Sequence, residues 1–230
     1  RAIRPAEAEA CKKNGIAYLE LQVAWDGLAV VVNKENTWAK EMTVEQLKKI
    51  WHPETKDFKN AKKWSDVNGQ WPNEDIKLFG PGADSGTFDY FTEAINGKEK
   101  VSRTDYEDSE DDNIIVKGVE RSRYALGYFG VAYYEAHKDK LSVVAIASKE
   151  GAPYVLPTRE NVLTNKYKPL SRPLYIYVKT SSLKRPEVAE FLKYYLRRDD
   201  LVADVKYVPL SAEQQVEQQQ KLEKALANQQ

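Results

Sequence analysis

The feature that most constrains this chain is a strand-like run that leads through a glycine-rich turn into a helix-like segment. Residues 76–79 predict a short strand, residues 80–87 form the turn, and residues 88–96 predict a helix that Gly97 ends. The first N–H groups of a helix have no partner within it, and the helix dipole adds about half a positive charge there. This order of elements therefore predicts an anion-binding turn.

Four residues of the turn carry that prediction. Ser85 and Thr87 supply hydroxyl donors, and Gly86 lets an anion approach the backbone. The carboxylate of Asp84 repels most anions, but it can accept a proton from phosphate, which still carries one at neutral pH, whereas sulfate does not. The alternative is an ordinary N-cap, in which Asp84 or Ser85 only satisfies a backbone N–H. A Walker loop is excluded because no Gly-Lys-Ser/Thr follows.

Composition argues against several other functions. The 35 basic and 35 acidic residues cancel, so we expect no nucleic-acid partner. A single cysteine and two histidines exclude an internal disulfide and a metal site rich in Cys or His, and we expect no metal and no cofactor. The apolar runs are too short to span a bilayer.

Strand-like and helix-like segments alternate along the chain, which favours an α/β fold. Residues 16–33 read as two strands, or as one long strand broken near Asp26-Gly27. Residues 43–46 have the spacing of a capping box and predict a helix to Trp51. Residues 141–147 read as one further strand.

Residues 186–196 predict an amphipathic helix. Its buried face is expected to hold Val188, Phe191, Leu192 and Tyr195, which recur at helical spacing.

Seven segments of the chain, found in the same order, resemble the PstS family, the phosphate-binding proteins of high-affinity phosphate ABC transporters. They cover nearly the whole sequence. They are VAWDGLAVVVN (23–33), MTVEQLKKIW (42–51), WSDVN (64–68), GPGADSGTFDYFTEAI (80–95), SEDDN (109–113), YALGYFGVAYYE (124–135) and LSRPLYIYV (170–178).

The resemblance implies a two-lobed α/β architecture, that of the type II periplasmic binding proteins. Residues 33–147 would form one lobe, and residues 1–32 and 148–230 the other. Asp26-Gly27 lies where a hinge is expected, although an ordinary turn explains this pair better.

The resemblance also implies that family members carry a further segment before the position of Arg1. That segment supplies strands, a helix N-terminus and a carboxylate of the first lobe, so this lobe is expected to be incomplete here. Such a piece would bind phosphate weakly and expose apolar surface.

Two arginines are candidates for the counter-ion of a bound phosphate. Arg1 matches the arginine of the family's Ser-Arg motif and is the first candidate. Better-known members carry an arginine within the turn, where this chain has Pro81-Gly82-Ala83. Arg103 is the second candidate, although we expect it to be a solvated surface residue. Asp111 and Asp112 resemble a metal pair, but acids in the first turn of a helix explain them better.

The function implied is capture of inorganic phosphate between two lobes and its delivery to the permease subunits of an ABC transporter, in the periplasm or at the cell surface. We expect no enzymatic activity. The alternatives are a phosphatase on the same scaffold and a phosphate-responsive surface protein.

Overall fold

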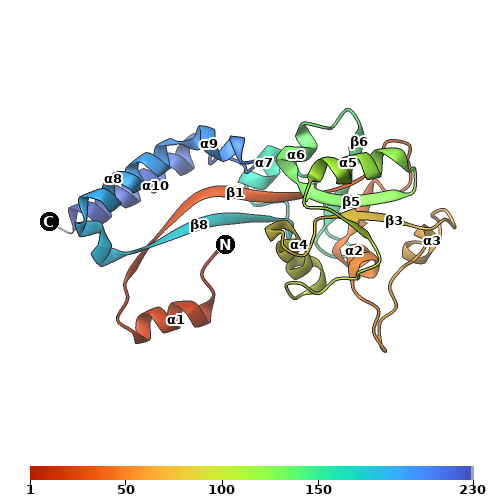
Figure 1. Ribbon diagram of the computed structural model, residues 1–230, viewed down its shortest axis with the longest axis horizontal. Coiled ribbons are helices and arrows are strands. Elements are labelled where there is room, and N and C mark those ends of the chain that lie inside the picture. Colours follow the sequence, from red (N-terminus) through yellow and green to blue (C-terminus); the bar gives the residue numbers. More distant parts are fainter. Residues whose placement is uncertain (229–230) are drawn as a thin grey trace. The chain divides into compact units, whose positions relative to one another are not determined.

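The computed structural model describes residues 1–228, and its internal contacts divide the chain into two units (Figure 1). Unit 1 comprises Arg1–Asp26 and Arg172–Gln230, and unit 2 comprises Gly27–Ser171. The assignment of residues 33–147 to one lobe stays a prediction.

Unit 2 is organised by a mixed sheet with the strand order β4-β3-β5-β1-β6. β3 runs parallel to both β4 and β5, whereas β1 is antiparallel to β5 and β6. Because parallel strands end at the same edge, the segments that follow β3, β4 and β5 meet there. The strands are β1 (Tyr18–Asn33), β3 (Lys77–Gly80), β4 (Glu107–Asp108), β5 (Ala125–Gly130) and β6 (Leu141–Val143).

Helices pack on both faces of this sheet. Successive residues of β5 point to opposite faces: Phe129 joins the apolar cluster formed with α5, and Tyr128 stacks on Phe91 of α4 and contacts Trp51 of α2. The remaining elements of unit 2 are α2 (Val44–Trp51), α3 (Trp64–Val67), α4 (Gly86–Asn96), α5 (Asp112–Arg121), α6 (Val131–Glu135), α7 (Arg159–Leu163) and the parallel pair β2 (Glu41–Thr43) and β7 (Ala145–Ala147).

Unit 1 contains the first half of β1, which pairs with β8. Figure 1 shows α8 and α10 side by side along this ribbon, and their leucines share a buried cluster with Leu21 of β1 and Leu183. The further elements are α1 (Pro5–Lys13), β8 (Ser171–Lys179), the 3-10 helix η1 (Thr180–Lys184), α8 (Pro186–Arg197), α9 (Asp199–Asp204) and α10 (Ala212–Ala227).

The α/β fold class expected from the sequence is confirmed, as are the helix caps. Thr43 and Gln46 form the capping box of α2, and Gly97 ends α4 with φ 84°. No helix within residues 1–228 combines the length and the apolar character needed to cross a bilayer.

Three local expectations were wrong. β1 is one continuous strand, because Asp26 stays extended inside it and its buried carboxylate lies 3.1 Å from the guanidinium of Arg172. The run 141–147 splits into β6 and β7, which pair with different strands, β1 and β2. On α8 the buried residues are Leu192 and Leu196, whereas Phe191 and Tyr195 are 57% and 40% exposed.

Candidate functional site

The turn between β3 and α4 places a helix N-terminus at the edge where the parallel strands end. β3 ends at Gly80, α4 begins at Gly86, and Ser85 is the N-cap in an extended conformation. The hydroxyl oxygen of Ser85 accepts a hydrogen bond of 3.1 Å from the amide of Thr87, and the carbonyl of Ser85 accepts one from Asp89. The N-cap that the sequence offered as the alternative reading is therefore present, with Ser85 as the capping residue.

The first turn of α4 carries two backbone donors, the amides of the exposed Gly86 and of the buried Phe88. Within residues 1–228, the amides of these two residues have no acceptor in hydrogen-bond range. A Cβ atom built on Gly86 would meet nothing within 4 Å. Two backbone donors, the partly exposed Thr87 and the space beside Gly86 thus lie together at the positive end of the helix.

The glycines on the other side of the turn lie in close contact with neighbouring side chains. A Cβ on Gly80 would lie 3.0 Å from the Tyr128 ring, and one on Gly82 would lie 2.1 Å from a carboxylate oxygen of Glu110. The hydroxyl of Tyr106 donates to the carbonyl of Pro81 at 2.9 Å. The contact beside Gly82 is with the far end of the exposed, flexible Glu110 side chain, so it does not explain why this turn lacks an arginine.

Carboxylates dominate the electrostatics near this edge. Burial, followed by the charges of Asp108 and Glu110, raises the pKa of Tyr106 to about 12. Burial and then the charges of Asp111 and Glu110 raise the pKa of Asp112 to about 6. Asp84 itself lies exposed in the turn. An anion bound here must meet a counter-ion or carry a proton that a carboxylate accepts.

Arg1, the first candidate for the counter-ion, belongs to unit 1, whereas Ser85, Gly86, Thr87 and Asp84 share the turn in unit 2. The guanidinium of Arg1 forms two hydrogen bonds to Glu7, of 2.6 and 2.8 Å. The hydrogen bond from Arg1 is the main reason that the pKa of Glu7 falls to about 2. The role of Arg1 towards a ligand stays a prediction.

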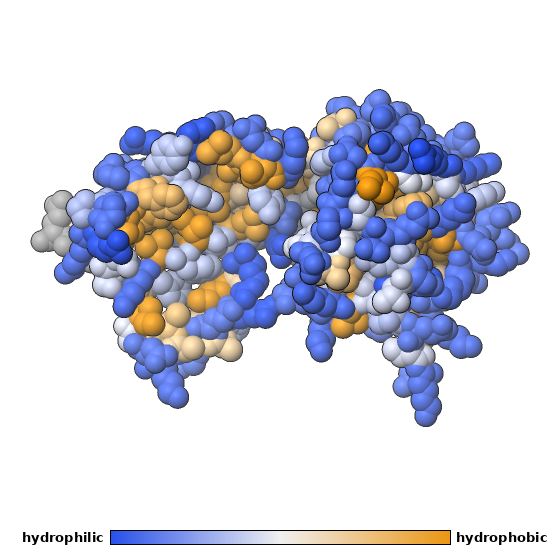
Figure 2. Space-filling view, in the orientation of Figure 1, coloured by the Kyte–Doolittle hydropathy of each residue, from blue (hydrophilic) through white to orange (hydrophobic). Residues whose placement is uncertain are grey.

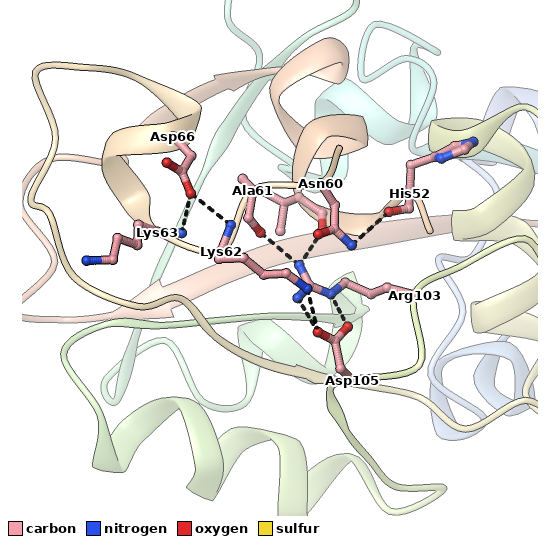
Figure 3. Close-up of polar contacts among 9 residues, drawn as sticks. His52, Asn60, Ala61, Lys62, Lys63, Asp66, Arg103 and Asp105 are labelled. Carbon is pink, nitrogen blue, oxygen red and sulfur yellow. Dashed lines mark hydrogen bonds and ion pairs between the residues drawn. The ribbon is translucent and has the colours of Figure 1, made fainter. Parts of the chain in front are cut away.

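The expectation that Arg103 is a solvated surface residue was wrong. Arg103 is only 7% exposed, and its guanidinium donates to the carbonyls of Ile50 and Ala61 and to the carboxylate of Asp105 (Figure 3). The hydrogen bond from Arg103 lowers the pKa of Asp105 well below its usual range. Arg103 therefore holds the end of α2 and the following loop together rather than facing a ligand.

The acidic pair before α5 forms a helix start, as its sequence suggests. Asp111 is the N-cap and accepts a hydrogen bond of 2.9 Å from the amide of Asn113. Across the part of the chain that the structure describes, no group of three or more His, Cys, Asp or Glu residues is arranged to hold a metal ion.

Sequence reasoning missed Asp89, which lies in the first turn of α4. One carboxylate oxygen of Asp89 is buried and has no hydrogen-bond partner within residues 1–228. Burying an unpaired carboxylate oxygen is costly, so this atom is a second candidate acceptor for a ligand proton near the turn. An acid in the first helical turn is too common for the sequence alone to distinguish it.

The chain is similar to known proteins in both sequence and fold. Residues 1–199 match the family model described as a PBP superfamily domain. A crystal structure of a possible phosphate binding protein from Planctomyces limnophilus is 50% identical, with a TM-score of 0.91 over 98% of this chain and 79% of that chain. The phosphate-binding protein PstS of Staphylococcus saprophyticus is 37% identical over 96% of this chain and 68% of its own length. The chain belongs to the PstS family of the PBP superfamily.

This chain spans only part of the length of the relatives named here. Protein SphX of Synechocystis sp. is 45% identical over 93% of this chain, but the match spans only 63% of that protein. The activity and the partners of the whole protein are therefore treated below as proposals.

Proposed function

We propose that this protein binds inorganic phosphate at the turn between β3 and α4 and is the solute-binding component of a phosphate ABC transporter. The observation that carries the proposal is the open start of α4, where Ser85, Gly86 and Thr87 surround unpaired amides. Membership of the PstS family supports the same ligand, because the relative from Staphylococcus saprophyticus is named a phosphate-binding protein.

Each residue of the turn has a distinct role in this proposal. The amides of Gly86 and Phe88 and the hydroxyl of Thr87 donate to phosphate oxygens, which offsets the loss of the ion's hydration. Asp84 accepts the proton of the ion, and Arg1 supplies positive charge. Sulfate carries no such proton, so it would leave the acceptor facing a lone pair.

Transport fits the site better than catalysis. A phosphatase needs an activated nucleophile or metal ions. The hydroxyl oxygen of Ser85 is engaged by the amide of Thr87, and a ring nitrogen of each histidine, His52 and His137, lies at hydrogen-bond distance from a neighbouring backbone carbonyl. We infer that the protein is not an enzyme, acts outside the cytoplasm and delivers phosphate to permease subunits.

Isothermal titration of the full-length protein with phosphate and with sulfate tests the proposal. Changing Ser85 to Ala and Thr87 to Val together should weaken phosphate binding at least about tenfold, because hydrogen bonds to a charged group are worth about 1.5–3 kcal/mol each. Ser211→Ala is the matched control, since Ser211 caps α10 in unit 1 through the same kind of bond. Unchanged binding by the double variant, or turnover of a chromogenic phosphate ester, would contradict the proposal.

A further inference from the structure

The backbone of the turn between β3 and α4 is held by hydrogen bonds at three successive carbonyls. The carbonyls that accept these bonds are those of Gly80, Pro81 and Gly82. The amide of Ser109 donates to the first at 3.1 Å, the hydroxyl of Tyr106 to the second at 2.9 Å, and the amide of Ser85 to the third at 3.1 Å. The donor to the Pro81 carbonyl is a side chain, so a substitution can remove that bond without altering the backbone.

The ring of Tyr106 packs against a buried aromatic cluster. Figure 2 shows mainly hydrophilic residues on the viewed face of unit 2, and the residues of the cluster lie beneath the surface. Tyr106 meets Trp51 edge-on, with 5.4 Å between the ring centroids. Trp51 in turn meets Phe91 of α4 and Tyr128 of β5 edge-on. These ring contacts do not need the hydroxyl, so phenylalanine at position 106 would keep them.

The chain just before Tyr106 is anchored independently of the turn. The amide of Arg103 donates to the carbonyl of Trp51 at 3.1 Å, and its guanidinium donates to the carbonyl of Ile50 at 2.9 Å. Asp105 accepts hydrogen bonds from the same guanidinium (Figure 3). Residues 103–105 are thus fixed to the end of α2, and Tyr106 extends towards the turn from a fixed base.

The bond from Tyr106 also restricts the peptide unit between Pro81 and Gly82. This unit is planar and trans, so the N–H of Gly82 points away from the hydroxyl that holds the Pro81 carbonyl. Glycine places few limits on its own φ, and it would otherwise leave this unit free to rotate. The carbonyl of Gly82 accepts the amide of Ser85, the N-cap of α4, so a rotation here would reach the start of the helix.

We propose that Tyr106 is a positioning residue for phosphate: its hydroxyl keeps the turn in the conformation that presents the first amides of α4 to the ion. This role rests on the proposed function, since Tyr106 acts on the ion only through the turn. Ligand sites depend on supporting hydrogen bonds of this kind, and a turn that is already ordered spares the ligand the cost of ordering it. Burial, followed by the charges of Asp108 and Glu110, raises the pKa of Tyr106 to about 12, so the donor stays protonated at neutral pH.

Titration of the full-length Tyr106→Phe variant with phosphate tests this role. The affinity should fall about fivefold or more, because one such hydrogen bond is worth about that factor in an equilibrium constant. Tyr90→Phe is the matched control, since the hydroxyl of Tyr90 also donates to a proline carbonyl, that of Pro169, at 2.7 Å. Tyr90→Phe should lower the melting temperature by an amount similar to Tyr106→Phe and leave phosphate affinity unchanged.

Amide hydrogen exchange of the ligand-free protein, measured by NMR, separates positioning from general stability. The Ser85 amide should exchange about fivefold faster or more in Tyr106→Phe, because the turn that holds it is loosened. The Gly97 amide at the other end of α4, bonded to the carbonyl of Glu93 at 3.0 Å, should keep its rate. A general loss of stability would instead raise the exchange rates at both ends of the helix.

These measurements distinguish failure of this role from failure of the proposed function. Phosphate binding by Tyr106→Phe as tight as that of the parent would overturn the role of Tyr106, and so would an equal loss of affinity in Tyr90→Phe. A parent protein that does not bind phosphate would refute the proposed function itself. An unchanged exchange rate of the Ser85 amide would show, with or without a ligand, that Tyr106 does not hold the turn.

Discussion

At the scale of single residues, Gly86 offers a direct test of whether the start of α4 is a ligand site or an ordinary helix start. Gly86 is the first residue of α4, its φ is not in the left-handed region, and a Cβ there would meet no protein atom within 4 Å. Neither backbone conformation nor packing therefore requires glycine at this position. The proposed phosphate site would account for the glycine, because a bound anion needs space against the backbone.

Gly86→Ala should consequently have opposite effects on stability and binding. Alanine in a helix is favoured over glycine by up to about 1 kcal/mol, so the urea midpoint should rise slightly. Phosphate affinity should fall about tenfold or more, because the added methyl group occupies the approach to the amides. Unchanged affinity measured by titration would show that the ligand does not approach this side of α4.

The acceptor for the phosphate proton can be identified by comparing two acids. Asp84 is exposed in the turn, whereas Asp89 has a buried oxygen without a partner in the described residues. If Asp84 is the acceptor, Asp84→Asn should reduce the preference for phosphate over sulfate about tenfold, because the amide can donate to a sulfate oxygen. Asp89→Asn should leave that preference unchanged. The reverse pattern in competition titrations would transfer the role to Asp89.

At the scale of elements, the start of α5 contains two adjacent acids with opposite effects on stability. Burial raises the pKa of Asp112 to about 6, whereas the amide of Asn113 lowers the pKa of Asp111. A carboxyl group with a raised pKa binds protons more tightly in the folded state than in the unfolded state. The free energy of unfolding therefore falls as pH rises from about 4 to about 6.

Asp112→Asn should therefore raise the urea midpoint at pH 7.5 and leave it nearly unchanged at pH 4, where the parent carboxyl is neutral. Asp111→Ala is the matched control: it removes the N-cap and should lower the midpoint at both pH values. A gain in stability from Asp112→Asn that persists at pH 4 would show that its charge is not the cause.

Local signals predicted most of the elements because their causes are local. Thr43, Ser85 and Asp111 each satisfy an amide within three residues along the chain, and Gly97 adopts the left-handed conformation that ends a helix. The residues 141–147 were misread because strand pairing depends on distant partners: β6 pairs with β1, and β7 with β2.

The features of the candidate site also divide into those that nearby residues determine and those that depend on distant segments. The turn, its cap and its exposed glycine follow from eight consecutive residues, 80–87. The carboxylate of Glu110 beside Gly82 and the burial of Arg103 depend on segments that the fold brings together. A charged residue that is buried by distant contacts looks the same in the sequence as a solvated one.

At the scale of the whole molecule, the positions of the tryptophans allow the unfolding of unit 2 to be followed by fluorescence. Trp25 lies in unit 1, and the other four lie in unit 2, which also contains the turn; they are Trp38, Trp51, Trp64 and Trp71. The Trp25→Phe variant of the full-length protein therefore reports unfolding of unit 2 alone. A ligand that binds only the folded state stabilises it in proportion to the logarithm of its concentration.

Phosphate at one hundred times its dissociation constant should stabilise unit 2 of this variant by about 2.7 kcal/mol, which raises its melting temperature by several degrees. Sulfate at the same concentration should produce a much smaller shift, and Gly86→Ala on the same background should reduce the phosphate shift. The measurement is thermal unfolding followed by tryptophan emission. Equal shifts with phosphate and sulfate would indicate a general salt effect, and no shift with phosphate would place the ligand away from α4.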